Sequence, residues 1–266
     1  MTYSFSPSTA KIAVSLSDGI ATVAIDNPSK HNAVDLEMWK AFPALMAALD
    51  QDPQVRVVIL RGAGRDSFAS GADIAEFETV RANAQGGRLY EAANEAAFWA
   101  VAHCSKPVIA MIRRFCLGGG FGLALSCDLR VASENAVFGI PAARLGIGYP
   151  PGAMKLVTAA VGAPAAKDLF FTARRIDAKE AERLGVVQRV VPDGELEAAA
   201  QALAAGIARN APLTIRAAKA AIDEAVGTMR PDVDPLALAD LCFDSADAVE
   251  GRKAFLEKRD PVFSGR

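Results

Sequence analysis

Three consecutive glycines mark the stretch of this chain whose residue types best suit chemistry at the backbone. Gly118 to Gly120 lie in CLGGGFGLALSCDLR, and an apolar run with helical spacing follows them directly. The first N–H groups of a helix lack partners within it and carry the positive end of its dipole. Glycines there let an anionic ligand atom approach closely, because they have no Cβ atom. The stretch predicts either such an anion site or tight packing of a helix on a strand, and alone it favours neither.

A second glycine-linked stretch, DSFASGADIAEF, follows the buried strand expected at residues 57–60. Small residues from Ser70 to Asp73 precede a helix, and a plain loop with Asp73 as the helix N-cap is the alternative interpretation. Two such stretches after two strands predict a pair of converging N–H donors. An oxyanion hole needs such a pair.

The elements that must position these stretches alternate strands with helices. A hairpin is expected at 11–26, where apolar and polar residues alternate around Asp18-Gly19. A helix is expected at 35–52, with Asp35 as its N-cap and Pro43 as a candidate break. Further strands are expected at 55–64, 107–112, 128–133, 136–140 and 185–191, with a helix at 88–104 and almost entirely helical structure at 195–258.

We therefore expect a single α/β body, with a core at residues 1–194 and a helical region at 195–266. The 266 residues are 52% hydrophobic, so the chain can bury a large core. The formal net charge of −2 gives no basis for a nucleic-acid partner. No apolar run is long enough for a membrane span, and the first residues do not form a signal peptide. The four cysteines form no CxxC pair, so we expect free thiols and a cytoplasmic protein.

Metal and α/β-hydrolase chemistry find no support in the residue pattern. The two histidines, His31 and His103, belong to no HxH or HExxH pattern, so we expect no metal site. The sequence contains no G-x-S-x-G, so we do not expect a nucleophilic serine of the α/β-hydrolase type.

Five segments together resemble the crotonase superfamily, the enoyl-CoA hydratase/isomerase family. They are NPSKHNAV, SFASGADIAEF, the central block at 106–152, FTARRIDAKEAERLGVVQRVVP and the tail FLEKRDPVFSGR. The resemblance covers nearly the whole chain. It implies a spiral of ββα units, followed by C-terminal helices that build a trimer, often a dimer of trimers.

The resemblance also implies that the ligand is an acyl-coenzyme A thioester, with no further cofactor. The N–H groups of Ala72 and Gly119 would hold the thioester oxygen and stabilise the enolate-like anion that develops there. The coenzyme A portion would lie near two groups of residues, the second of them on a neighbouring subunit. These residues are Lys30, Phe68, Ser70, Asp73 and Ile74, then Phe255 and Lys258. The two lysines suit phosphates as point charges, and the alternative is that both are ordinary solvated side chains.

The sequence departs from the hydratases of this family at the two glutamates that position water and exchange its protons. The first position is Gly122 and the second is Ala142, and neither side chain can move a proton. We therefore expect weak hydration of simple enoyl-CoA thioesters. Arg113-Arg114 stands where the family commonly has Asn-Gly. We favour a surface-facing turn there over positive charge directed toward the substrate.

Four side chains are candidates for the chemistry of the missing glutamates, and two of them, Glu76 and Glu78, lie just past Ala72 on the helix expected to start near Asp73. Glu76 lies one helical turn past Ala72, and Tyr149 lies in a segment that the resemblance implies to line the pocket. Arg144 could hold a carboxylate of the acyl group. Each has a structural alternative: a solvent-facing glutamate, a tyrosine that braces the proline turn after it, or an arginine in a surface ion pair.

The residues support three hypotheses about function. The first is an acyl-CoA enzyme, with isomerisation, decarboxylation and thioester hydrolysis left open beside weak hydration. The second is a non-catalytic subunit that binds acyl-CoA, and the third is a purely structural oligomer, which leaves the two glycine-linked stretches without a purpose. We favour the enzyme, because a backbone oxyanion hole survives the loss of both glutamate side chains.

Overall fold

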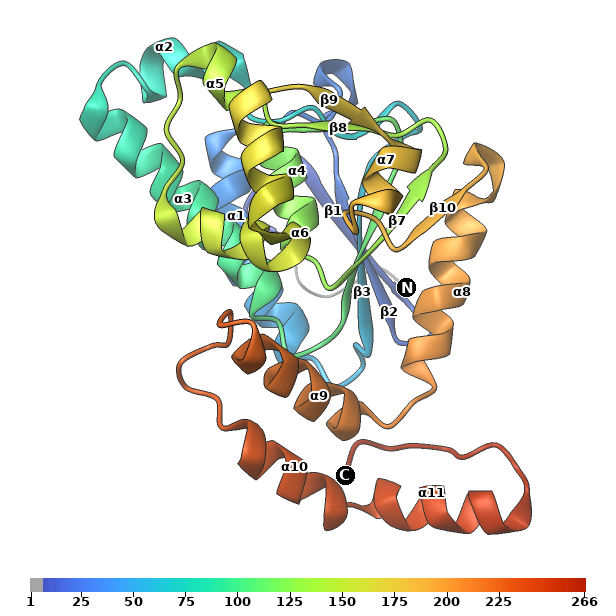
Figure 1. Ribbon diagram of the computed structural model, residues 1–266. Coiled ribbons are helices and arrows are strands. Elements are labelled where there is room, and N and C mark those ends of the chain that lie inside the picture. Colours follow the sequence, from blue (N-terminus) through green and yellow to red (C-terminus); the bar gives the residue numbers. More distant parts are fainter. Residues whose placement is uncertain (1–6) are drawn as a thin grey trace.

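The computed structural model describes residues 7–266, in which strands and helices alternate along the chain (Figure 1). The strands are β1 (Ile12–Ser17), β2 (Ile20–Ile25), β3 (Val57–Gly62), β4 (Ser67–Ala69), β5 (Val108–Ile112), β6 (Phe115–Leu117), β7 (Leu129–Ser133), β8 (Val137–Gly139), β9 (Arg175–Asp177) and β10 (Arg189–Val191). The α-helices are α1 (Leu36–Gln51), α2 (Phe77–Val80), α3 (Ala84–Ala102), α4 (Gly118–Leu125), α5 (Ala142–Leu145), α6 (Pro151–Thr172), α7 (Ala178–Arg183), α8 (Leu196–Ala208), α9 (Pro212–Ala225), α10 (Pro235–Phe243) and α11 (Ala246–Glu257). Three short 3-10 helices are η1 (Pro28–Lys30), η2 (Ile74–Glu76) and η3 (Asp193–Glu195).

The predicted hairpin is confirmed as β1 and β2, which pair antiparallel from Ile12↔Ile25 to Ser17↔Ile20. Asp18 and Gly19 form its turn with φ of 51° and 76°. Positive φ at both turn residues matches the twist of the flanking strands. The local sequence therefore determines this element by itself.

Two sheets organise the core. The larger has the order β1-β2-β3-β5-β7-β10 and the smaller has the order β4-β6-β8-β9. The pairs β3–β4, β5–β6 and β7–β8 each place their first strand in the larger sheet and their second in the smaller one, and a helix follows each pair. The chain thus winds as ββα units, and the predicted crotonase-like α/β fold is confirmed.

Helices α1, α3 and α4 pack together beside the sheets and bury the largest side chains. Trp39 and Phe42 of α1 are fully buried, as are Phe98 of α3 and Phe121 of α4. Asp35 caps α1, since its carboxylate accepts from the Met38 N–H at 2.9 Å. The helix continues through Pro43, so the break considered there does not occur.

Helix α8 covers another face of the larger sheet, through Leu196, Ala200 and Ala204. The division of the chain expected after residue 194 falls within η3, just before α8, and it stays a prediction. The predicted run of helices is confirmed by α8 to α11. Helices α9, α10 and α11 lie at one end of the molecule, far from α2 and α5 (Figure 1). No helix within residues 7–266 is both long and apolar enough to cross a membrane.

Candidate active site

The two glycine-linked stretches meet in the structure. A Cβ atom placed on Gly71 would lie 3.2 Å from the carbonyl oxygen of Leu117 and 3.8 Å from the Cα of Gly118. Both glycines have positive φ, at 112° and 51°. A side chain at Gly71 would be strained and would crowd the facing backbone, so the residue type permits this contact. The convergence predicted from the two stretches is therefore present.

Hydrogen bonding around Ala72 leaves one N–H group unused. The Val34 N–H donates to the Gly71 carbonyl at 2.9 Å, and the Asp73 N–H donates to the Val34 carbonyl at 3.0 Å. Within residues 7–266 no hydrogen bond uses the Ala72 N–H between them. Gly119 is the second residue of α4, where the N–H has no partner within the helix. Ala72 and Gly119 line one pocket, so its wall offers two backbone donors.

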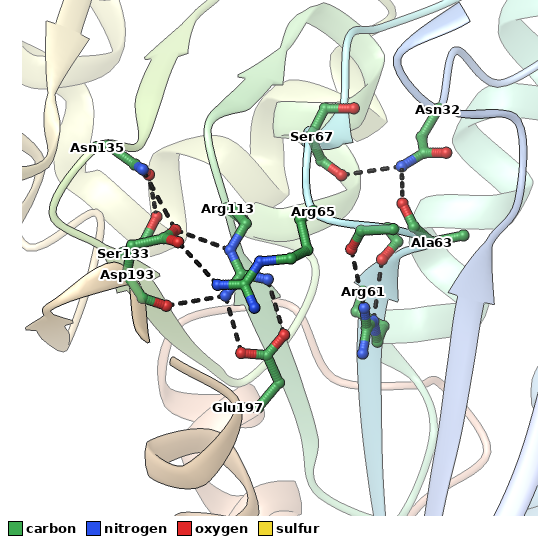
Figure 2. A network of polar contacts seen from close by, with 12 residues as sticks. Asn32, Arg61, Ala63, Arg65, Ser67, Arg113, Ser133, Asn135, Asp193 and Glu197 are labelled. Carbon is green, nitrogen blue, oxygen red and sulfur yellow. Dashed lines mark hydrogen bonds and ion pairs between the residues drawn. The ribbon is translucent and has the colours of Figure 1, made fainter. Parts of the chain in front are cut away.

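Asn32 anchors the loop between β3 and β4 by hydrogen bonds, as Figure 2 shows. Its side-chain amide donates to the carbonyls of Ala63 and Ser67 at 3.0 and 2.9 Å. Asn32 is buried and belongs to the NPSKHNAV segment. The segment therefore holds β4 and the loop before it in place.

Gly120 serves the other purpose expected of the glycine run, which is tight packing of a helix on a strand. A Cβ atom on Gly120 would lie 2.6 Å from the Cβ of Ala69 on β4. Such a distance is not tolerated, so α4 packs on the strand only because glycine is present there. The glycines thus serve both predicted purposes, with Gly118 and Gly119 at the pocket and Gly120 in helix–strand packing.

The pocket beside Ala72 and Gly119 has a volume of about 70 Å³, and shares seven lining residues with a larger hollow of about 850 Å³. The shared residues are Ile74, Phe77, Arg81, Glu91, Leu145, Ile147 and Tyr149. Most are apolar, and Arg81, Glu91 and Tyr149 are not. A few polar groups in an apolar pocket are typical of a site for a small ligand.

Of the two positions that the resemblance matches to the family's glutamates, Ala142 lies at this site, and Gly122 lies outside the lining of both hollows. Ala142 is buried and lines the pocket. Gly122 is buried in α4, and a Cβ atom there would lie 2.5 Å from Cζ of Phe98. The Phe98 ring fills the space that a side chain at 122 would enter. The packing of α3 against α4 therefore leaves no room for a glutamate side chain at position 122.

Helix α3 supplies polar groups that the sequence reading did not single out. Glu91 and Asn94 line the pocket with the donors, and Glu95 lines the larger hollow. Arg81 forms an ion pair with Glu91, and these side chains are 12% and 16% exposed. Spacings of three and four residues in an alanine-rich helix are the signal that would have grouped these three residues on one face.

Burial and charge act in opposite directions on Glu91. Burial raises the pKa of its carboxyl group, and the neighbouring Arg81 guanidinium partly offsets this, while Glu95 adds to the increase. The Arg81 guanidinium lies 4.4 Å from the ring centroid of Phe77 and 4.0 Å from that of Tyr90. Two aromatic faces therefore fix the cation beside the carboxylate.

Of the proton-transfer and carboxylate-binding candidates compared with the pocket, Tyr149 lines it, while Glu76 and Arg144 do not. Tyr149 lines the pocket and packs edge-on against Phe170, with ring centroids 5.0 Å apart, and burial raises its pKa. The Glu76 carboxylate accepts from the Leu36 N–H at 2.9 Å and does not line the pocket. Arg144 is exposed and also lies outside the lining. Tyr149 thus shares the site with the donors, and Glu76 is engaged at the start of α1.

The expected coenzyme A contacts fall into two groups. Lys30 pairs with Asp73 at 2.5 Å, and the Ser70 hydroxyl donates to the Lys30 carbonyl at 3.0 Å, close to the first donor. Asp73 caps η2 as predicted, accepting from the Ala75 N–H at 3.1 Å.

The remaining expected contacts differ in exposure and position. Phe68 is fully buried in the core, whereas Ile74 is 63% exposed at the pocket rim. Phe255 and Lys258 lie at α11, at the opposite end of the molecule from α2 and α5 (Figure 1). These two residues therefore do not join the site within one chain.

The surface-facing turn favoured for Arg113 is wrong, and so is the alternative of charge directed toward the substrate. Arg113 is buried and donates to the carboxylates of Asp193 at 2.8 Å and Glu197 at 2.7 and 2.8 Å (Figure 2). It joins the β5–β6 turn to the start of α8. Arg114 is 54% exposed and lies 3.9 Å from Asp66. The ion pairs of Arg113 join residues about 80 positions apart, so the local sequence could not predict them.

Comparison with known proteins gives the family. A model of the enoyl-CoA hydratase/isomerase family matches residues 15–266. The chain is 37% identical over 245 residues to the short-chain-enoyl-CoA hydratase of Clostridium acetobutylicum, covering 90% of this chain and 92% of the relative. It is 36% identical over 258 residues to a carnitinyl-CoA dehydratase of Escherichia coli, covering 93% and 95%. The chain therefore belongs to the enoyl-CoA hydratase/isomerase family.

A solved structure supports the same assignment at the level of the fold. The enoyl-CoA hydratase/carnithine racemase from Magnetospirillum magneticum superposes with a TM-score of 0.90 at 36% identity, covering 98% of this chain and 97% of that one. The chain is an enzyme of the crotonase superfamily, and its family acts on acyl-CoA thioesters.

Proposed function

We propose that this protein binds an acyl-CoA thioester with its carbonyl oxygen between the N–H groups of Ala72 and Gly119. The observation that carries this proposal is the meeting of two glycine-linked loops at one pocket, each with a free backbone donor. Hydrogen bonds to that oxygen strengthen as it gains negative charge, so they lower the barrier to forming an enolate. The remaining part of coenzyme A would extend past Lys30 and Ser70.

The favoured chemistry is an enolate-forming reaction that needs one proton-transfer group, such as isomerisation of a double bond. Hydration of crotonyl-CoA would be weak, because Gly122 and Ala142 replace the pair that would position and activate water. The relatives named as hydratases and dehydratases support the acyl-CoA substrate. Decarboxylation and thioester hydrolysis are the other reactions compatible with the donors.

The first test compares turnover of crotonyl-CoA and vinylacetyl-CoA by the purified protein, followed through the enoyl-thioester absorbance. We expect slow loss of this absorbance with crotonyl-CoA and its rapid appearance with vinylacetyl-CoA. Gly119→Pro removes one donor in the first turn of α4, and should lower turnover by about 100- to 1000-fold. Gly119→Ala keeps the N–H and is the control, with thermal unfolding to verify folding. Full turnover by a folded Gly119→Pro variant would contradict the assignment.

The second candidate function is a non-catalytic subunit that binds acyl-CoA, and the same two substituted positions favour it. It predicts that butyryl-CoA raises the thermal unfolding temperature, because a ligand that binds only the folded state stabilises it. It also predicts no product from any thioester. Product from one acyl-CoA would exclude it.

A homotrimer or a dimer of trimers is part of the proposal, with Phe255 and Lys258 of a neighbouring subunit reaching the coenzyme A. The exposure of Phe255 at 83% supports a partner for α11. A cytoplasmic location, without nucleic-acid or membrane partners, stays the expectation from the sequence.

A further inference from the structure

The ionisable groups of the pocket come from a part of the fold other than the one that carries the family's two glutamates. The resemblance places those positions within α4 and at the start of α5, and here they hold Gly122 and Ala142. Glu91 instead projects from α3 to line the same pocket as Ala72 and Gly119. Its carboxylate is the acidic group that shares this lining with both donors.

The geometry points to Glu91 as the proton-transfer residue of this site, acting on the acyl carbon next to the thioester carbonyl. This inference rests on the proposed function, since the donors must hold the oxygen for that carbon to become acidic. Glu91 is a catalytic residue in this assignment. Arg81, which acts through Glu91, is a positioning residue.

The contacts of the Glu91 carboxylate suit a base. Arg81 donates from Nη2 to Oε1, and within residues 7–266 no hydrogen bond occupies Oε2. One oxygen is therefore anchored while the other is available to take a proton. Burial weakens solvation of the anion, which makes the carboxylate a stronger base than an exposed one.

The other acidic candidates are engaged elsewhere or are unsuited to the step. Glu76 accepts from the backbone of α1. A Cβ atom on Gly152 would lie 1.7 Å from Oε1 of Glu95, so that carboxylate lies against the first turn of α6. Burial keeps the Tyr149 hydroxyl protonated, so it serves as a donor and not as a base.

The chemical step balances without an oxidant, reductant or second substrate. With vinylacetyl-CoA, the Glu91 carboxylate takes a proton from the α-carbon, and the electrons of that C–H bond move into an enolate held by Ala72 and Gly119. The resulting glutamic acid then returns the proton to the γ-carbon. The double bond moves from the β,γ to the α,β position as the carbonyl re-forms, and the product is crotonyl-CoA. Butyryl-CoA in deuterated water would undergo only the first transfer and its reverse, and would gain deuterium at the α-carbon.

The test measures both reactions in Glu91→Gln and Glu91→Asp, with Glu78→Gln as the matched control. Glu78 is exposed on α2 and lies outside the lining of both hollows. We expect Glu91→Gln to lower deuterium exchange and isomerisation by about 100- to 10,000-fold. Binding of butyryl-CoA should persist, Glu91→Asp should recover part of the rate, and Glu78→Gln should match the wild type. Retained exchange in Glu91→Gln, or equal loss of binding and exchange, would overturn the assignment.

A pH profile separates proton transfer from a structural role. The charged and titratable groups that face Glu91 are Arg81, Glu95, Tyr90 and Tyr149. Arg81 favours the ionised form of Glu91, so Arg81→Gln should move the acid limb of the rate profile to higher pH. An unmoved limb would contradict the role of Arg81 and of Glu91 as the titrating base.

The outcomes also separate this inference from the proposed function. Exchange that is lost in Glu91→Gln but kept in Gly119→Pro would overturn the oxyanion hole and leave Glu91 in place. Exchange that is lost in Gly119→Pro but kept in Glu91→Gln would overturn Glu91 alone. Wild-type protein that binds butyryl-CoA yet gives neither exchange nor isomerisation would overturn both.

Discussion

At the scale of single residues, the packing of Phe98 against Gly122 opposes the restoration of a glutamate at position 122. The Phe98 ring lies 2.5 Å from the place of a Cβ atom at 122. We expect Gly122→Glu to lower the free energy of unfolding by about 1–3 kcal/mol through overpacking alone. A carboxylate buried there without a partner would add to this cost. Urea unfolding measures the change, and crotonyl-CoA hydration should not increase.

Removal of the Phe98 ring provides the control for this prediction. Gly122→Glu should cost less free energy of unfolding in a Phe98→Ala background than in the wild type. The effects of the two changes on stability should therefore not add. Additive effects would mean that the ring does not oppose the new side chain. A single Gly122→Glu variant with the stability of the wild type would contradict the packing argument directly.

The residues of the site differ in how far the sequence predicts them. Gly71 and Gly118 were predictable, because a glycine that permits close backbone approach is a local signal. Glu91 was missed, since its importance depends on burial and on a cation ten residues away. Arg113 was misread for the same reason, because its partners lie on η3 and α8. Local patterns describe backbone requirements well, and they do not show which charges become neighbours.

At the scale of elements, Arg113 joins a turn between two strands to the start of α8, and its contacts predict a pH dependence of stability. Arg113 lowers the pKa of Glu197 from its ordinary value of 4.5 to about 2. A carboxyl group with a lowered pKa contributes stability above pH 4.5 that is lost as the pH falls toward 2. Arg113→Met should therefore be less stable than the wild type near neutral pH, with a difference that shrinks as the pH falls.

Urea unfolding at several pH values between neutrality and pH 2 checks this prediction. Arg183→Met is the control, since its guanidinium is 71% exposed and its ion pair is worth little. A constant difference between wild type and Arg113→Met across this range would show that the ion pairs do not set it.

Most elements were predictable from periodicity and caps, while their arrangement was not. The alternation in residues 11–26 and the N-cap at Asp35 specify the hairpin and the start of α1 locally. The order β1-β2-β3-β5-β7-β10 depends on pairing between distant strands, and the sequence predicted only a spiral of ββα units, through family resemblance. Pro43 is tolerated within α1 because the helix is held by its buried face, which outweighs one missing hydrogen bond.

At the scale of the whole molecule, the C-terminal helices leave many large apolar side chains exposed to water. Large apolar side chains on or beside α10 and α11 are more than half exposed. They are Leu236, Leu241, Phe243, Val249, Phe255, Leu256 and Val262. Exposed apolar side chains gathered on neighbouring helices suit a protein interface, and closed symmetric assemblies are the common outcome. We therefore predict that sedimentation will show a trimer or a dimer of trimers.

Dissociation of the assembly should weaken coenzyme A binding if a neighbouring subunit completes the coenzyme A contacts. Leu241→Asp with Phe243→Asp places two charges on this surface and should give smaller assemblies that bind butyryl-CoA more weakly, because Phe255 and Lys258 no longer reach a neighbour. Asp240→Asn changes an exposed residue of the same helix and should leave the mass unchanged. Deuterium exchange at saturating butyryl-CoA should persist in the dissociated variant, because Ala72, Gly119 and Glu91 all belong to one chain. Loss of exchange at saturation would mean that the assembly also shapes the pocket. A wild-type protein that sediments as a monomer would contradict the assembly itself.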